Sequence, residues 1–218
     1  MQNIYCISGL GADEGVFKNL DLSFAKPVFI KWIQPLRDES LSSYSIRLQQ
    51  KFIHDSNPVI LGLSLGGMIA TEISKANPLA KTIIVSSAKT VNEIPFYWKI
   101  FQYAPLYKIL PHWSIKKSVI IHYYFLGASS GSTKKYVDEA LEKADTNFYR
   151  WAVGAIISWR NKTVPQNITH IHGLNDRILP SKFVKADITI NNGGHLMIME
   201  RANEISALIK QYVVNKCL

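Results

Sequence analysis

Short apolar runs alternate with longer segments of mixed polarity along most of the chain. Runs of this length, bounded by polar residues, Gly or Pro, predict buried strands, and the segments between them show helical spacing, as at Leu41, Tyr44 and Leu48. Strands that alternate with helices predict an α/β fold with a doubly wound, mostly parallel sheet. The predicted strands are 4–7, 27–33, 58–61, 81–86, 167–173 and 186–190, and the predicted helices are 13–20, 40–52, 65–73 and 202–213.

The alternation of strands and helices stops between residues 87 and 165. A helical pattern runs from Thr133 through Trp159, with a break near 145–147. The first part of this interval is rich in aromatic side chains, which either form a small core of their own or line a ligand pocket. These aromatic residues are Phe96, Tyr97, Trp98, Phe101, Tyr103, Tyr107, Trp113, Tyr123, Tyr124 and Phe125.

One serine lies between two glycines directly after an apolar run, in Gly62-Leu63-Ser64-Leu65-Gly66. Residues 58–61 predict a strand before it, and the residues after it continue as a helix, so the serine occupies a strand-to-helix turn. Such a turn strains the serine backbone, and the small glycines allow the close approach of neighbouring segments. Ser64 is therefore a candidate nucleophile, with the amide of Leu65 at the positive end of the following helix.

A serine hydroxyl becomes a nucleophile when a histidine accepts its proton and a carboxylate orients that histidine. Asp176 follows the strand at 167–173, and His195 follows the strand at 186–190. Both residues are thus expected at the carboxyl ends of strands, as is Ser64, and chemistry gathers at this edge of an open parallel sheet. The sequence predicts a Ser64, Asp176 and His195 triad.

Other titratable residues compete for these roles. His172 lies close to Asp176, and a structural hydrogen bond in the turn is the expected role. His170 and His172 together resemble a metal-binding His-x-His pair, but no third ligand is evident, so no metal site is expected. Asp187, the rival acid, lies near the start of its strand at the opposite edge of the sheet. The remaining histidines are expected at the surface or in helix caps, and they are His54, His112 and His122.

Acyl transfer also requires two backbone amides that stabilise the oxyanion. The loop Ser8-Gly9-Leu10-Gly11 follows the first predicted strand and is positioned to supply one of them. Leu10 is the candidate donor from this loop, and Leu65 is the second.

Together these motifs resemble the α/β-hydrolase fold superfamily: residues 8–11, 62–67, 172–180 and 193–195 match its pattern. More closely, the chain resembles small bacterial serine hydrolases of this fold that begin with Gly-Leu-Gly-Ala-Asp-Glu and, shortly after, Phe, here Gly9–Glu14 and Phe17. The chain departs from the pattern at Ser8, where many members have histidine. It also starts almost directly with the strand before the oxyanion loop, so we expect a reduced N-terminal part.

The resemblance implies one domain over residues 1–218, with a helical cap at 87–165 inserted after the fourth strand and lying over Ser64. It implies hydrolysis of a small or medium ester or thioester through an acyl-enzyme, without a cofactor. Two alternatives stay open. The same triad serves carbon–carbon hydrolases or lyases, and the fold also occurs in non-catalytic small-molecule binding proteins. A serine nucleophile argues against dehalogenases, which use aspartate there.

Composition adds limits to this prediction. With 218 residues, 47% hydrophobic, the chain can bury one substantial core. Its net charge of +9 comes from scattered lysines, with only Lys116-Lys117 and Lys134-Lys135 adjacent, so a solvated basic surface is expected rather than a nucleic-acid site. The two cysteines, Cys6 and Cys217, predict no disulfide framework.

The same sequence features bear on location and assembly. No targeting segment precedes the first strand, and no apolar run is long enough to span a bilayer. A cytoplasmic protein without a membrane partner is therefore expected. An exposed apolar face of the cap could support a homodimer.

Overall fold

The computed structural model describes residues 1–99 and 119–214. Several residues considered above lie outside this part of the chain. They are Phe101, Tyr103, Tyr107, His112, Trp113, Lys116, Lys117 and Cys217.

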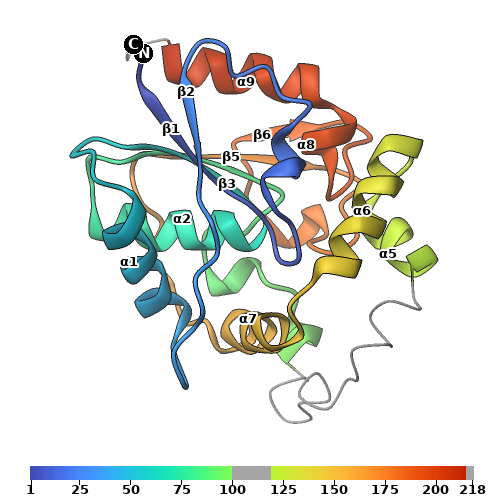
Figure 1. Cartoon of the computed structure of the whole chain (residues 1–218), viewed down its shortest axis with the longest axis horizontal. Coiled ribbons are helices and arrows are strands. Elements are labelled where there is room, and N and C mark those ends of the chain that lie inside the picture. Colours follow the sequence, from blue (N-terminus) through green and yellow to red (C-terminus); the bar gives the residue numbers. More distant parts are fainter. Residues whose placement is uncertain (100–118, 215–218) are drawn as a thin grey trace.

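A six-stranded sheet forms the centre of the molecule, with the strands in the order β2-β1-β3-β4-β5-β6 and every neighbouring pair parallel (Figure 1). The fold class predicted from the alternation of apolar runs is confirmed. The strands are β1 (Asn3–Ile7), β2 (Lys26–Phe29), β3 (Val59–Leu63), β4 (Lys81–Val85), β5 (Ile168–Gly173) and β6 (Ile188–Ile190).

The second strand is shorter than predicted, because it ends at Phe29 and not at Ile33. The Ile30 amide still donates to the Cys6 carbonyl at 2.9 Å. Further along, the Tyr44 hydroxyl takes the place of a neighbouring strand. It accepts from the Ile33 amide at 3.1 Å and donates to the Ile33 carbonyl at 2.9 Å. At Ile33, where the sequence predicted strand pairing, a side chain from the next helix thus binds the backbone instead.

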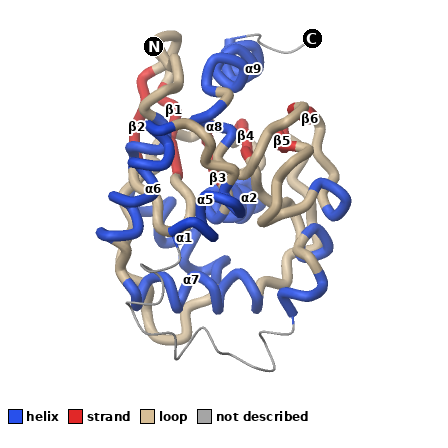
Figure 2. Tube along the Cα trace, turned by 90° about the vertical axis from the view of Figure 1, so that its right-hand side faces the viewer, coloured by secondary structure: helices blue, strands red, loops and turns tan. Residues whose placement is uncertain are grey.

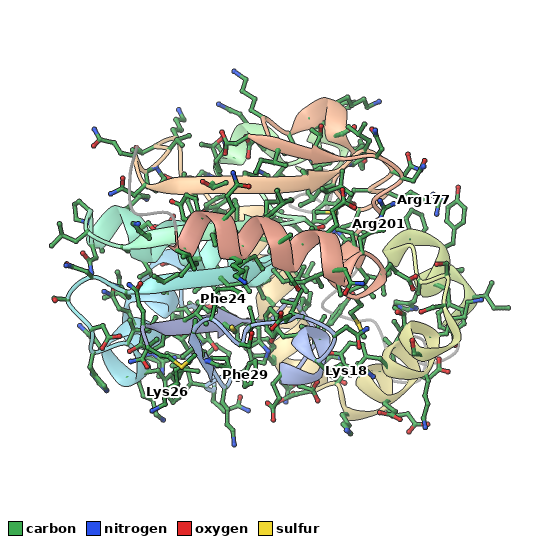
Figure 3. All side chains as sticks on the ribbon, turned by 90° about the horizontal axis from the view of Figure 1, so that it is seen from above. Lys18, Phe24, Lys26, Phe29, Arg177 and Arg201 are labelled. Carbon is green, nitrogen blue, oxygen red and sulfur yellow. The ribbon has the colours of Figure 1, made fainter. Side chains whose placement is uncertain are left out.

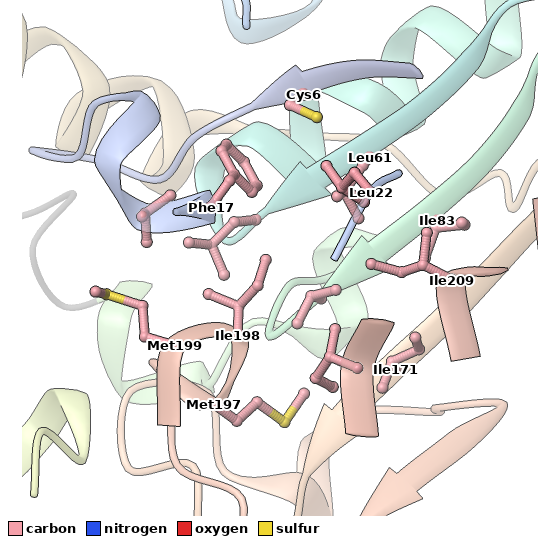
Figure 4. Close-up of a cluster of buried hydrophobic side chains, with 14 of the residues drawn as sticks. Cys6, Phe17, Leu22, Leu61, Ile83, Ile171, Met197, Ile198, Met199 and Ile209 are labelled. Carbon is pink, nitrogen blue, oxygen red and sulfur yellow. The ribbon is translucent and has the colours of Figure 1, made fainter. Parts of the chain in front are cut away.

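Helices cover both faces of the sheet (Figure 1). On one face, α1 (Leu41–Phe52) and α2 (Leu65–Ala76) pack on a buried cluster that includes Tyr44, Ile60 and Ile84. On the other face, α8 (Met197–Glu200), α9 (Ala202–Val214) and the short 3-10 helix η1 (Glu14–Phe17) pack on a second cluster (Figure 4). The helix predicted at 13–20 is thus only a single short turn. These two layers hold the sheet rigidly behind the site.

The described part of the interval after β4 contains helices and no strand. The pattern from Thr133 through Trp159 forms two helices, α6 (Gly131–Lys143) and α7 (Thr146–Ser158). The break falls at Asp145, whose carboxylate caps α7 by accepting from the amides of Asn147 and Phe148. The other helices of this interval, and one 3-10 turn after β5, are η2 (Val91–Glu93), η3 (Phe96–Lys99), α5 (Val119–Leu126) and η5 (Ser181–Phe183).

The inserted helices lie around the edge of the sheet where the strands end. α5 and α6 lie beside the loop that follows β1, and α7 lies at the end of the molecule opposite α9 (Figures 1 and 2). Within the described residues, no helix combines the length and the apolar character that crossing a bilayer requires.

Viewed from the α9 side, the basic side chains Lys18 and Lys26 lie apart from Arg177 and Arg201 (Figure 3).

Candidate active site

Ser64 occupies a strained turn between β3 and α2. Its φ of 52° and ψ of −118° lie in a region that side chains other than Gly rarely adopt. The surrounding structure holds it there, because the Ser64 amide donates to Val85 at 3.0 Å and its carbonyl accepts from the Ser87 hydroxyl at 2.7 Å. The turn therefore presents the Ser64 hydroxyl at the carboxyl edge of the sheet.

The neighbouring glycines make this turn possible, as the sequence predicted. A Cβ at Gly62 would lie 2.5 Å from the Gly66 carbonyl oxygen. A Cβ at Gly66 would overlap the carbonyl oxygens of Ile7 and Ser8, at the end of β1. Gly66 thus lets α2 begin directly against the first strand of the sheet.

The three residues of the predicted triad meet in one hydrogen-bonded chain. His195 Nε2 lies 2.9 Å from the Ser64 hydroxyl oxygen, and His195 Nδ1 lies 2.7 Å from Asp176 Oδ2. Since an ionised carboxylate only accepts, Nδ1 carries the proton and Nε2 is free to accept the Ser64 proton. Asp176 and His195 are 4% and 3% exposed, so this pair is shielded from water, whereas Ser64 is half-buried.

Asp176 is fixed by its own turn. Its Oδ1 accepts from the amides of Ile178 and Leu179 at 2.9 and 2.8 Å, which leaves Oδ2 for His195. Burial by itself would raise the pKa of Asp176, but the charge and hydrogen bond of His195 and the Leu179 amide lower that pKa below its ordinary value. The carboxylate is thereby kept ionised beside the imidazole.

The two other histidines of β5 support this turn. The carbonyl of Leu179 can only accept, so His172 carries its proton on Nε2 and donates at 2.8 Å. His172 Nδ1 is then an acceptor for His170 Nε2, 3.3 Å away. Burial lowers the pKa of both imidazoles, which favours their neutral forms. The bond of His172 is thus the structural one expected from the sequence.

The predicted oxyanion donors flank Ser64. Leu65 is the first residue of α2, and Leu10 follows Gly9, where an added Cβ would lie 3.4 Å from Ser64 Cβ. Neither the Leu10 nor the Leu65 amide donates to any other residue in the part of the chain that the structure describes. Both amides are therefore available to a ligand beside Ser64.

A hydrogen bond closes the loop that carries Leu10. The Ser8 hydroxyl, which stands where the resemblance leads one to expect histidine, donates to the Ala12 carbonyl at 2.8 Å. The Trp32 indole donates to the same carbonyl at 3.0 Å. The sequence pattern did not reveal this contribution of Trp32, although its position shortly after β2 places it at the correct edge of the sheet.

The remaining candidates lie elsewhere. Asp187 precedes β6, accepts from the His170 amide at 2.7 Å and lies 3.5 Å from Lys89 Nζ, so it is removed from Ser64. His54 is exposed after α1, and His122 lies on α5. Within residues 1–99 and 119–214, no three His, Cys, Asp or Glu side chains are grouped to hold a metal ion.

The segment that includes α5 contacts the loops of Asp176 and His195, and the particular contacts were not visible in the sequence. The Leu196 amide donates to the Leu126 carbonyl at 2.8 Å, and Gly127 approaches Gly194, the residue before His195. Arg177, beside Asp176, donates to the Tyr124 carbonyl at 2.7 Å. The segment from α5 to α6 is therefore tied to the loops that hold the acid and the base.

The parallel sheet, the strained serine turn and the position of Asp176 and His195 after the last two strands define the α/β-hydrolase fold. Comparison with solved structures agrees. An esterase from Exiguobacterium antarcticum aligns with a TM-score of 0.72 at 15% identity, over 99% of this chain and 92% of that chain. A bromoperoxidase from Bacillus anthracis aligns with a TM-score of 0.71 at 12% identity, over 98% of this chain and 92% of that chain.

A third solved structure, the N-acyl homoserine lactonase AidH complexed with N-butanoyl homoserine, aligns with a TM-score of 0.67 at 16% identity. This alignment covers 100% of this chain and 92% of that chain. No protein-family model matches the sequence, and a comparison with curated proteins finds no match. At such low identities the likeness establishes the fold, while the chemistry has to be argued from the site.

Proposed function

We propose that this protein is a serine hydrolase that cleaves a small or medium carboxylic ester or thioester. The observation that carries the proposal is the hydrogen-bonded chain from the buried Asp176 through the buried His195 to the half-buried Ser64 hydroxyl, with contacts of 2.7 and 2.9 Å. A serine on a strained turn, a base that accepts its proton and a carboxylate that orients the base are the components of acyl transfer.

In the proposed acylation step, the Ser64 hydroxyl oxygen attacks the substrate carbonyl carbon while His195 Nε2 takes its proton. The carbonyl oxygen becomes an oxyanion that accepts from the amides of Leu10 and Leu65. His195 then gives the proton to the leaving alcohol or thiol as the bond to the carbonyl carbon breaks. Asp176 remains ionised and stabilises the imidazolium of His195.

In the proposed deacylation step, water replaces the alcohol. His195 Nε2 takes a proton from the water as its oxygen attacks the acyl carbon. His195 then gives this proton to the Ser64 oxygen as the bond between that oxygen and the acyl carbon breaks, and the carboxylic acid leaves. In both steps, His195 is the group that accepts and donates each proton.

We assign the helices between 87 and 165 the role of a cap. The support is their contact with the catalytic loops, through Leu126 to the loop of His195 and through Tyr136 to the loop after β1, where its hydroxyl accepts from the Asp13 amide at 3.1 Å. A cap in this position excludes water from the reacting groups.

The test is labelling of the purified protein with a fluorophosphonate, measured by intact mass. We expect one adduct on the wild type and none on Ser64→Ala or His195→Ala. Turnover of p-nitrophenyl esters and acyl thioesters should be lost in the same two variants. No adduct and no turnover on a folded wild-type protein would contradict the proposal and favour lyase-type chemistry or a binding role.

A further inference from the structure

A cavity of about 200 Å³ opens beside the loop that follows β1, bounded by the segment after β2 and by the junction of α6 and α7. Leu10, Trp32 and Phe148 form its apolar wall, and the rings of Trp32 and Phe148 are 5.0 Å apart. Gln34 and Asp145 lie at its exposed rim and are joined by a hydrogen bond of 3.1 Å. The cavity therefore has an apolar interior and a polar outer end.

This cavity begins next to the nucleophile, although Ser64 does not line it. Gly9 packs on Ser64, and Leu10 is the next residue of the loop. The amide of Leu10 is one of the two candidate oxyanion donors. A carbonyl oxygen held by this amide would thus leave the rest of the bound group at the entrance of the cavity.

The strand order determines which part of a substrate can enter. The wall residues Leu10 and Trp32 follow β1 and β2, Ser64 follows β3, and Asp176 and His195 follow β5 and β6. The cavity and the base therefore lie on opposite sides of the nucleophile. Since His195 must reach the leaving oxygen to protonate it, the leaving group belongs on the side of His195. The acyl group belongs on the other side.

We infer that the cavity beside Leu10 binds the acyl group, and that the substrates are esters or thioesters of short carboxylic acids. This inference rests on the proposed function. Pockets that enclose a whole drug-sized ligand measure about 300–1,000 Å³, so this smaller cavity holds only one end of a substrate. A longer chain has to pass the charged rim at Asp145 and Lys143, where its burial ends.

The experiment measures kcat/KM for p-nitrophenyl acetate, butyrate, hexanoate and dodecanoate. In the wild type, kcat/KM should rise from acetate to hexanoate by roughly fourfold for each buried methylene, and it should fall for dodecanoate. Ala140→Leu and Ala144→Leu each add bulk to the cavity, one on α6 and one just beyond it. Each should lower the ratio of hexanoate to acetate turnover by about tenfold or more.

The matched control is Ala207→Leu, at an exposed position of α9 far from the cavity, which should keep the wild-type ratio. Two independent cavity variants are used, with thermal unfolding as a check, so that one variant that fails to fold does not decide the result. A second series, with ethyl, butyl and hexyl acetate, varies the alcohol at a constant acyl group. The cavity variants should leave its ratios unchanged.

The outcomes separate the two proposals. If the wild type hydrolyses esters but both folded cavity variants keep the wild-type acyl ratio, the assignment of the cavity is wrong and the hydrolase proposal stands. If the alcohol series changes instead, the cavity binds the leaving group, and the assignment is again wrong. If the wild type neither hydrolyses esters nor labels at Ser64, both proposals fail together.

Discussion

His172 donates a hydrogen bond from Nε2 to the carbonyl oxygen of Leu179 at 2.8 Å, and this bond closes the turn that holds Asp176. The Leu179 amide, on the other side of the same residue, donates to Asp176 Oδ1. His172 therefore supports Asp176 through the backbone of Leu179, and its Nε2 also lies 3.7 Å from Asp176 Oδ2. In the proposed mechanism it is a positioning residue for the carboxylate and has no contact with substrate.

Two substitutions of His172 should distinguish the effect of its hydrogen bond on Asp176 from the effect of the volume that its side chain fills. His172→Leu removes the donor and leaves the buried Leu179 carbonyl without its partner, which should cost roughly 1–3 kcal/mol of unfolding free energy and lower kcat. His172→Gln, which can donate from a similar place, should recover part of both losses. Denaturant unfolding and ester turnover check this prediction, and equal kcat in the two variants would exclude a positioning role.

Asp176→Asn should retain the fold, because an amide oxygen can still accept from Ile178 and Leu179. The amide group would favour the wrong tautomer of His195, so kcat should fall by about 10⁴-fold. Asp187→Asn, which alters the rival acid before β6, is the matched control and should keep turnover within about twofold of the wild type. Steady-state kinetics of both variants decide between the two carboxylates.

Two glycine substitutions test the turn that carries the nucleophile. Gly66→Ala places a methyl group on the carbonyl oxygens of Ile7 and Ser8, and we expect a loss of about 3 kcal/mol or more in unfolding free energy. Gly131→Ala, at the first position of α6, meets no atom within 4 Å. It should be neutral or stabilising by up to about 1 kcal/mol. Thermal and denaturant unfolding measure both effects.

Glu200 links α8 to the segment between α5 and α6, and this link should depend on pH. Burial alone would raise its pKa, but hydrogen bonds from Ser129, Ser130 and Thr133 lower the pKa from 4.5 to about 2. Because the pKa of Glu200 is lower in the folded protein than in the unfolded chain, the ionised carboxylate stabilises the fold at any pH above the unfolded-state pKa. This contribution should be fully present above pH 4.5 and disappear as the pH falls toward about 2.

The measurement is thermal unfolding as a function of pH. Glu200→Gln should lose stability near neutral pH and show a smaller decline between pH 4.5 and about 2 than the wild type. Glu204→Gln, which removes the carboxylate that pairs with Arg201 just before α9, controls for the loss of a negative charge. An unchanged decline in Glu200→Gln would show that another group causes it.

The sequence was informative where structure is determined locally. The turn at Ser64 follows from its glycines and the strand before it, and the fold class follows from the alternation of apolar runs. The positions of Asp176 and His195 after their strands were also visible, and the structure brings both side chains to Ser64. The catalytic roles of Asp176 and His195 stay predictions. So do the oxyanion donors, the cap, the cytoplasmic location and a homodimer.

Contacts between distant segments could not be predicted. The backbone of Ile33, beyond the end of β2, pairs with the hydroxyl of Tyr44, which belongs to the next helix. The loop of Leu10 depends on Trp32, and its far end on Tyr136 from the inserted helices. No period of apolar residues encodes such pairings, because each one arises only when the complete sheet has brought the segments together.

The hydrogen bond from the Leu196 amide to the Leu126 carbonyl has a mechanical consequence. A movement that carries α5 away from the sheet must break this bond and separate Gly127 from Gly194, next to the base. The same two contacts hold the loop before His195 in place, and His195 Nε2 lies 2.9 Å from the Ser64 hydroxyl oxygen. The position of α5 therefore contributes to the alignment of the imidazole with Ser64, although α5 is far from Ser64 in the sequence.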